Sequence, residues 1–492
     1  MKITKESIYL IFTFLFLLIP FIAIPWKFDG FEYPKFLVIT FLGSLCGFII
    51  LLSKKEKIKL PGREFLIYFS LFIVSVIFSN NFLYSFFGDY PRLNQNLILY
   101  LSLFLIAILY LNFLEKINIF QLVFFVSLIL GASTFFENNE RVYSTLGQPN
   151  FLGIILVLGI IYSLEKFKDS KFYVLASLFL AVALVKTASI TSIFALTIGV
   201  TYFFWNEGRK YYKYFLPLLF LVALIIFLHP LTSTKIHDAY NLFTQNKETK
   251  ISDSLLVRFY IWEDSIKIPF ASIKNFLIGI GPENFSLFYE TYRGEKINFT
   301  SEWASLIDKP HNYFLEILIE QGILGLFSFL YLLYVNVKSN KKDRKYLIPI
   351  IIFLFFNWAF LYLQLIIFLI LTKKDEYKNE INLPKISLAI LCIFLAIINF
   401  QFFFKYDEIS NEIDYYKTNN PEVKLNGLNV YYNQEDLPIY IQNIKETYPN
   451  NLKMWFEIYK TEKSKNYFNT NVTKEKIKYM RSDLLEWNEV FK

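Results

Sequence analysis

Long runs of apolar residues separated by short polar segments occupy most of this chain of 492 residues. Each run is close to the ~20 residues that an α-helix needs to cross a bilayer. The apolar residues are not dispersed at the helical or strand period of a soluble domain. The pattern predicts an all-α polytopic membrane protein, with spans expected at 7–25, 34–52, 64–80, 96–114, 118–134, 150–165, 172–186, 189–205, 212–229, 312–337, 346–372 and 386–404.

Basic residues in the connecting segments predict the orientation, because Lys and Arg in short loops stay on the cytoplasmic side. Segments 53–63 and 338–345 hold five basic residues each, whereas 26–33 and 81–95 hold one each. We therefore expect a cytoplasmic N-terminus and an extracytoplasmic loop at 230–311.

The run 346–372 departs from this simple count. If it crossed the membrane once, the basic residues of 373–385 would lie outside. The run also carries Asn357 and Gln364 near its middle, which suits a short hairpin or a broken helix buried against protein. We expect the hairpin, which brings the count to about 12–13 segments and sends the chain outside after 386–404.

Composition and charge support this organisation. Hydrophobic types form 55% of the residues and charged types 19%, which excludes a disordered chain and fits a soluble one badly. The net charge of +8 is explained by the loops beside the membrane, so no nucleic acid is implied. We expect a membrane domain over 1–404 and a small soluble, helical, extracytoplasmic domain over 405–492.

Candidate chemistry lies in the outside segments, which hold Arg92, Arg141, Arg258, Arg293 and His311. Arginine suits bidentate phosphate recognition, so the cluster indicates an anionic substrate. The alternative is that each arginine pairs with a loop carboxylate or a lipid head group. The spans are expected to be nearly free of charge, which argues against an ion-coupled transporter.

Three stretches resemble the O-antigen ligase family over roughly residues 80–372. The stretch 309–326 is similar to the family hallmark, with a His-Asn pair, Leu-Glu, and then Gly-Ile-x-Gly. The stretches 258–264 and 279–285 look like its Arg-x-x-x-Trp and Gly-x-Gly-Pro elements, and 141–150 is similar to its Arg…Gly…Pro-Asn loop. The glycines are expected to permit tight turns and close packing rather than to bind phosphate.

One departure from the family pattern concerns the helix expected at 189–205. Members often carry a Ser-Arg pair at its start, where this chain has Ser189 and Ile190. The family's arginine is thus missing here, and Lys186 is the candidate substitute.

The resemblance implies a membrane glycosyltransferase of the GT-C type in the bacterial inner membrane, with its active site facing outside. The donor would be a glycan on undecaprenyl diphosphate, and the acceptor lipid A core, a growing glycan or a protein. The family's ligases imply inversion without a metal or other cofactor, and the chain shows no Asp-x-Asp pair or His cluster for a cation.

The expected site residues follow from this chemistry. His311 is the candidate base for the acceptor hydroxyl, although a lone His at a helix start is commonly a capping or packing residue. Arg258 is the leading clamp on the diphosphate. Glu316 could orient His311 or bind acceptor. The further candidates for substrate binding are Arg141, Arg92, Asn312 and Lys186.

Two other classes of function remain as alternatives. A flippase or permease for lipid-linked glycan would be expected to show broken helices in paired repeats or buried ionisable groups. A membrane-anchored binding protein would not require twelve spans.

Overall fold

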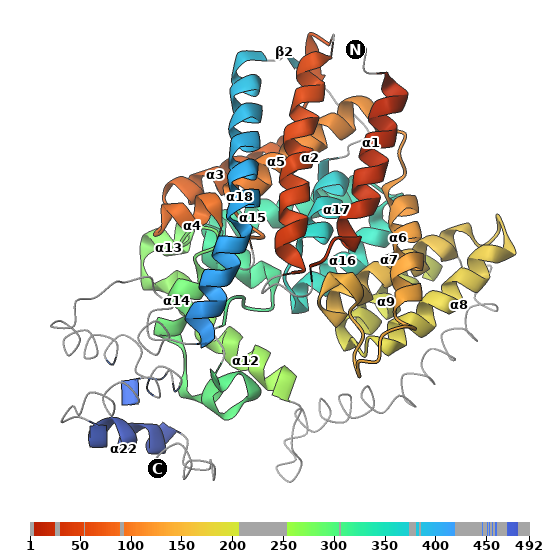
Figure 1. Ribbon diagram of the computed structural model, residues 1–492. Helices are drawn as coiled ribbons and strands as arrows, with labels where there is room; N and C mark the ends of the chain where they lie inside the picture. Colours follow the sequence, from red (N-terminus) through yellow and green to blue (C-terminus); the bar gives the residue numbers. More distant parts are fainter. Residues whose placement is uncertain are drawn as a thin grey trace.

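The computed structural model describes most of the membrane part of the chain and parts of the remainder (Figure 1). The expected span 212–229, Arg92 and most of 405–492 lie outside the described residues. The described residues are 4–24, 30–53, 55–88, 93–205, 253–304, 307–372, 380–382, 385–418, 470–480, Lys445, Asn450, Leu452, Trp455, Ile458 and Tyr459.

The first half of the chain forms apolar helices that match the predicted spans up to residue 205. Asn96, Asn118 and Ser189 begin three of them, because each side-chain oxygen accepts a backbone N–H of the first turn. The short α4 (Phe82–Phe87) was not predicted. The others are α1 (Lys5–Leu18), α2 (Glu32–Leu52), α3 (Arg63–Ile77), α5 (Leu97–Phe113), α6 (Ile119–Ser133), α7 (Pro149–Lys166), α8 (Lys171–Lys186) and α9 (Ile190–Phe203).

Small residues let these helices approach closely, as is usual for helices packed in a membrane. A Cβ added at Gly43 of α2 would overlap Ser102 of α5. A Cβ added at Gly153 of α7 would overlap Ser192 of α9. The packing of the bundle therefore depends on the absence of side chains at these glycines.

The segment from 253 to 307 is a folded unit and not an open loop. It comprises α12 (Asp253–Ser265), α13 (Ile273–Ile278) and α14 (Phe285–Tyr292), with 3-10 turns at Pro269–Ala271, Glu295–Phe299 and Ser301–Ala304. It has its own apolar core, whose members include Ile261, Phe285 and Tyr289, and this core includes Ile319 of the following helix. The unit is thereby fixed to the membrane bundle.

The following helix, α15 (Tyr313–Ser339), is interrupted at Gly322, where φ is 71°. Ile280 and Gly281 donate backbone N–H groups to the carbonyls of Ile319 and Glu320, at 3.0 Å and 2.9 Å. A Cβ at Gly322 would overlap the backbone of α13. The expectation that the motif glycines serve turns and close packing is confirmed at these positions.

The predicted hairpin at 346–372 is present as two short helices, α16 (Arg344–Phe356) and α17 (Leu361–Thr372). The backbone N–H of Tyr313, at the start of α15, donates to the Asn357 carbonyl just after α16, at 3.2 Å. Asn336, near the end of α15, donates to the Leu371 carbonyl near the end of α17, at 3.4 Å. The chain therefore turns back at 357–360 and returns to the end at which α15 finishes.

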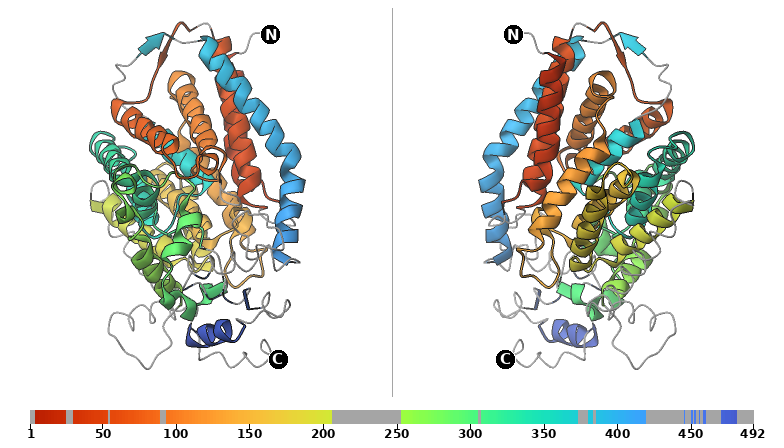
Figure 2. Two further views of the ribbon diagram at one scale, coloured as in Figure 1. Left: turned by 90° about the vertical axis from the view of Figure 1, so that its left-hand side faces the viewer. Right: turned by 90° about the vertical axis from the view of Figure 1, so that its right-hand side faces the viewer.

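A two-stranded antiparallel ribbon marks that end of the molecule (Figure 2). Strand β1 (Lys57–Lys59) pairs with β2 (Glu380–Asn382), so the basic segments 53–63 and 373–385 are joined to the same ribbon. α18 (Lys385–Thr418) then runs back along α2, and the Tyr33 hydroxyl donates to the Phe402 carbonyl at 3.0 Å. By length and composition, α2, α7, α15 and the first part of α18 can each span a membrane. The chain is a multi-pass membrane protein.

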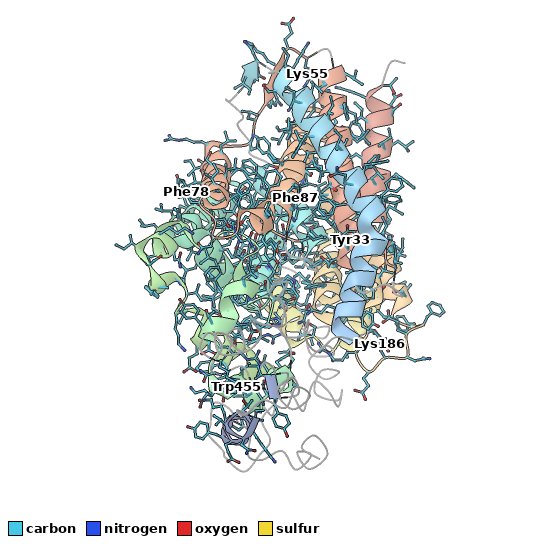
Figure 3. All side chains as sticks on the ribbon, turned by 60° about the vertical axis from the view of Figure 1, so that its left-hand side comes forward. Tyr33, Lys55, Phe78, Phe87, Lys186 and Trp455 are labelled. Atoms are coloured by element: carbon cyan, nitrogen blue, oxygen red, sulfur yellow. The ribbon has the colours of Figure 1, made fainter. Side chains whose placement is uncertain are left out.

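The described C-terminal residues lie at the opposite end, against the 253–307 unit. Asn298 donates to the Asn450 carbonyl at 2.7 Å, and Asn450 donates to the Arg293 carbonyl at 3.2 Å. Figure 3 shows Trp455 and Lys186 towards this end and Lys55 at the other. The last described helix, α22 (Thr470–Met480), lies there too (Figure 1).

We expect an enzyme reporter that works only outside the membrane to be active when it is fused after Lys492 and silent when it is fused near Lys378. The reason is that β2 (Glu380–Asn382) pairs with β1 (Lys57–Lys59), which lies within the basic segment 53–63 that favours the cytoplasm. Activity of the fused reporter, normalised to the amount of fusion protein, measures this. A fusion after Lys59 is the matched silent control. An active reporter at Lys378 together with a silent one at Lys492 would contradict the orientation.

Candidate active site

Hydrogen bonds bring three of the motif stretches together around the start of α15. Trp262 of α12 donates its Nε1–H to the carbonyl of Pro310 at 2.7 Å. Asn150, in the first turn of α7, donates to the side-chain oxygen of Asn357 at 3.0 Å. Because Asn357 also accepts the first backbone N–H of α15, the stretches 141–150, 258–264 and 309–313 meet at one place.

Arg141 and Arg258 lie close enough to interact as like charges. Burial, followed by the charge of Arg141, lowers the pKa of Arg258 to about 10, and burial also lowers the pKa of Arg141. Within the described part of the chain neither has a carboxylate partner, and the buried Nε of Arg258 makes no hydrogen bond. Among the described residues, Arg141 Nε donates to the Thr187 carbonyl, at 3.4 Å. Two neighbouring guanidinium groups that lack a carboxylate partner among the described residues have the chemistry that suits an anion.

Arg293 shows the alternative role for an arginine in this unit. It is 2% exposed, and its guanidinium donates to both Glu290 oxygens at 3.3 Å. Its pairing with a carboxylate of α14 is therefore structural, unlike the arrangement at Arg141 and Arg258.

His311 occupies a strained backbone position immediately before α15. Its φ of 53° lies in the left-handed region, which residues other than glycine rarely adopt and which clusters at functional sites. Its half-buried ring packs against Trp358 in the break between α16 and α17, with ring centroids 4.7 Å apart. The Asn312 side-chain oxygen accepts the N–H groups of Phe314 and Leu315 and so caps α15. Asn312 therefore has a structural role as the N-cap of α15, directly after His311.

Lys186, the last residue of α8, contacts both sides of the loop that carries Arg141. Its ammonium donates to the Thr134 carbonyl and lies 4.7 Å from the centre of the Phe135 ring. Its own carbonyl accepts the N–H of Val142 at 3.4 Å. At the position of the family's Ser-Arg pair, Ser189 donates to Asn150 at 2.7 Å. The stretch 141–150, which carries Arg141, is therefore held by hydrogen bonds to Lys186 and Ser189.

Glu316 was expected to orient His311 or to bind the acceptor, but its carboxylate contacts Lys309. It is fully buried, and one carboxylate oxygen lies 2.7 Å from Lys309 Nζ. Sequence reasoning gave Lys309 and Glu283 no role. The available signal was that each is a charged residue within an otherwise apolar or glycine-rich motif stretch.

The expectation of nearly charge-free helices is wrong for two of them. Glu32 and Lys35 are buried in the first turn of α2, and Glu316 and Glu320 are buried in α15.

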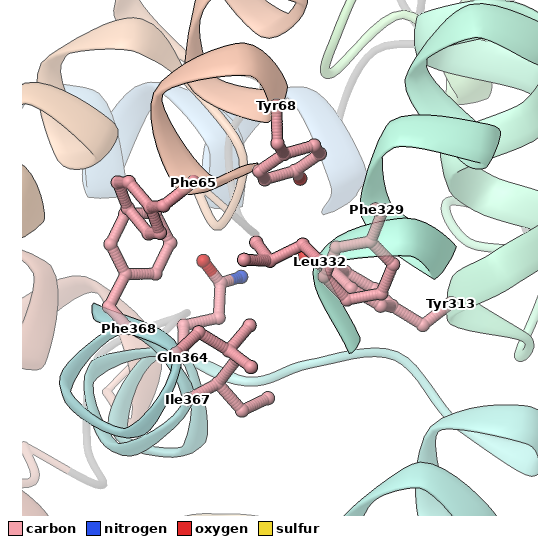
Figure 4. A pocket seen from close by; sticks show the side chains of 9 residues that line it. Phe65, Tyr68, Tyr313, Phe329, Leu332, Gln364, Ile367 and Phe368 are labelled. Carbon is pink, nitrogen blue, oxygen red and sulfur yellow. The ribbon is translucent and has the colours of Figure 1, made fainter. Parts of the chain in front are cut away.

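A small pocket among α3, α15 and α17 is separate from this site (Figure 4). Aromatic and aliphatic side chains line most of it, and Tyr68, Tyr313 and Gln364 add the polar groups. None of the candidate site residues lines the pocket. It is a packing feature of the bundle and not a place for a charged substrate.

Residues 175–330 match the model of a protein family described as O-antigen ligase. The matched region contains the Arg258 and His311 stretches, whereas the Arg141 stretch precedes it. No curated protein matches the chain at a significant level.

Proposed function

The chain belongs to the O-antigen ligase family, and from that premise we propose that it transfers a glycan from undecaprenyl diphosphate to an acceptor hydroxyl. The family makes it a membrane enzyme of glycosyltransferase character. The proposal adds the donor, an inverting and metal-independent GT-C-type mechanism, and a site on the outer face of the inner membrane.

The arginine pair is the observation that carries this proposal. Arg141, in the loop before α7, and Arg258, in α12, are far apart in the sequence, yet the charge of Arg141 lowers the pKa of Arg258. A diphosphate placed between them would replace this repulsion with charge-assisted hydrogen bonds. The same contacts would stabilise the negative charge that grows on a diphosphate as it leaves a sugar.

His311 would serve the other half of the reaction as the base for the acceptor hydroxyl. The acceptor oxygen forms a bond to the anomeric carbon while the bond from that carbon to the diphosphate oxygen breaks. The diphosphate keeps the electron pair, and the hydroxyl proton passes to the His311 imidazole. The Trp262–Pro310 hydrogen bond links α12, which carries Arg258, to the residue before His311. Attack from the side opposite the leaving group would invert the anomeric carbon.

Deletion of the gene should leave lipid-linked donor untransferred, and the cell's glycans would then identify the acceptor. Lipid A core without polymer would indicate a ligase, single-repeat glycan a polymerase, and unglycosylated protein a protein oligosaccharyltransferase. Electrophoresis of envelope glycans and mass spectrometry of lipid extracts measure these outcomes. Donor accumulation that the wild-type gene reverses is the expected result. Unchanged glycans and unchanged lipid-linked donor in the deletion strain would reject a transferase role.

A further inference from the structure

A buried cluster of charged side chains, Lys309, Glu283, Glu316 and Glu320, includes the residue two positions before the candidate base His311. Lys309 Nζ lies 2.7 Å from Glu316 and 3.7 Å from Glu283, and the charge of Glu320 also acts on it. None of the four side chains is more than 2% exposed. The proposed transfer reaction gives this cluster no direct part.

Lys309 is the only cation among the described members of this cluster. Burial by itself would lower the pKa of Lys309, but Glu283, Glu316 and Glu320 raise it, so the ammonium stays charged. A buried charge that loses its partner is strongly destabilising, whereas a pair replaced by neutral groups of similar size is often tolerated. Removing Lys309 alone, or its carboxylate partners alone, would therefore leave buried charges unpaired and destabilise the fold.

The cluster connects separate parts of the site to the residue two positions before His311. Glu283 accepts the backbone N–H of Gln95, which follows the Arg92 loop. Glu320 accepts the backbone N–H of Phe285 at 3.3 Å. Through these contacts, the segment after residue 92, the 279–285 stretch and α15 all converge on Lys309.

Two residues near the cluster have strained backbone conformations. Glu283 and His311 both have left-handed backbone conformations, with φ of 61° and 53°. Such conformations persist only where surrounding contacts enforce them. Lys309 is ion-paired to the first residue and lies two positions from the second. The Trp262 contact to Pro310 and the Asn312 cap hold the intervening chain.

We propose that Lys309 is a positioning residue that, through its buried ion pairs with Glu283 and Glu316, holds His311 in its left-handed conformation. This inference rests on the proposed function for its effect on catalysis. The positioning itself is a property of the fold.

The kinetic test separates positioning from stability by removing both sides of the ion pairs. Lys309→Met alone should lower thermal stability sharply, because buried carboxylates lose their cation. Combining Lys309→Met with Glu283→Gln and Glu316→Gln should restore stability. The triple variant should still lose on the order of 10- to 100-fold in kcat, with the donor KM nearly unchanged, since misplacing a catalytic group mainly affects the chemical step. The assay uses purified protein in detergent, lipid-linked glycan extracted from the deletion strain, and envelope acceptor.

The matched control is the exposed pair Lys296–Glu263 in the same unit, at 2.8 Å. Lys296→Met with Glu263→Gln likewise removes a cation together with its carboxylate partner, and it should leave stability, kcat and KM at wild-type values. A stable triple variant with wild-type kcat would overturn the proposal, because the cluster would then contribute to stability alone.

A labelling experiment tests the positioning without relying on transfer. Cys46 and Cys392 are buried and free, so a membrane-impermeant maleimide should react mainly with a cysteine introduced as His311→Cys. Adding the triple substitution should raise the labelling rate several-fold, because residue 311 is no longer held, while the Lys296–Glu263 control should not change it. Equal rates in all three backgrounds would reject the positioning role, even if the protein proved not to transfer glycan.

Discussion

His311→Ala is expected to lower glycan transfer by about 100- to 10,000-fold, the contribution typical of a positioned general base. The imidazole is the only described histidine side chain at the convergence of the motif stretches, and it sits in a strained backbone position beside Trp358. The variant should remain in the membrane, because one half-buried side chain before α15 contributes little to the bundle. Lipid-linked donor should accumulate in cells that carry it. Transfer assays on membranes with matched amounts of protein measure the loss.

His237→Ala is the matched control for this experiment, since no family motif surrounds His237 in the sequence. It should transfer glycan at the wild-type rate. Near-normal transfer by His311→Ala, with its expression confirmed, would remove the base from the proposed mechanism.

Arg258→Lys is expected to be almost as damaging as Arg258→Ala, with losses of about 100- to 1,000-fold for the removal of one preorganised donor to the developing charge. A lysine cannot reproduce the planar fork that binds two phosphate oxygens together. Burial and the neighbouring Arg141 already lower the pKa of Arg258 to about 10, and the same surroundings would lower the pKa of a lysine as well. The substitution would thus weaken both the geometry and the charge of the clamp.

The measurement is the transfer rate of the two Arg258 variants beside Arg344→Lys. Arg344 lies at the opposite end of the bundle, where it donates to the Lys338 carbonyl at 3.0 Å, so its substitution should have little effect. Wild-type activity in Arg258→Lys would mean that the residue supplies general attraction only. A loss confined to high pH would locate the effect in the charge, because a lysine there would deprotonate as the pH rises.

The sequence alone determined the membrane architecture of the described regions, because the length of an apolar run is a local property. The eight runs up to residue 205 became helices near their expected bounds, with starts set by caps such as Asn96 and Ser189. The turn within 346–372 was also predictable, since basic residues after the run and Asn357 inside it pointed to the same topology. The motif stretches indicated which residues could form the site, but not which side chains those residues contact.

The tertiary structure decided which charges meet. Whether an arginine meets a carboxylate depends on how distant segments pack, so Arg293 proved to be paired with Glu290, whereas Arg258 is influenced by the like charge of Arg141. Lys309 and Glu283 carried no periodic signal, and they meet where the 279–285 stretch packs against α15 beside its break at Gly322. Hydrophobic periodicity specifies which segments enter the membrane. The pairing of charges between those segments is set by close packing across long sequence separations, which no local pattern encodes.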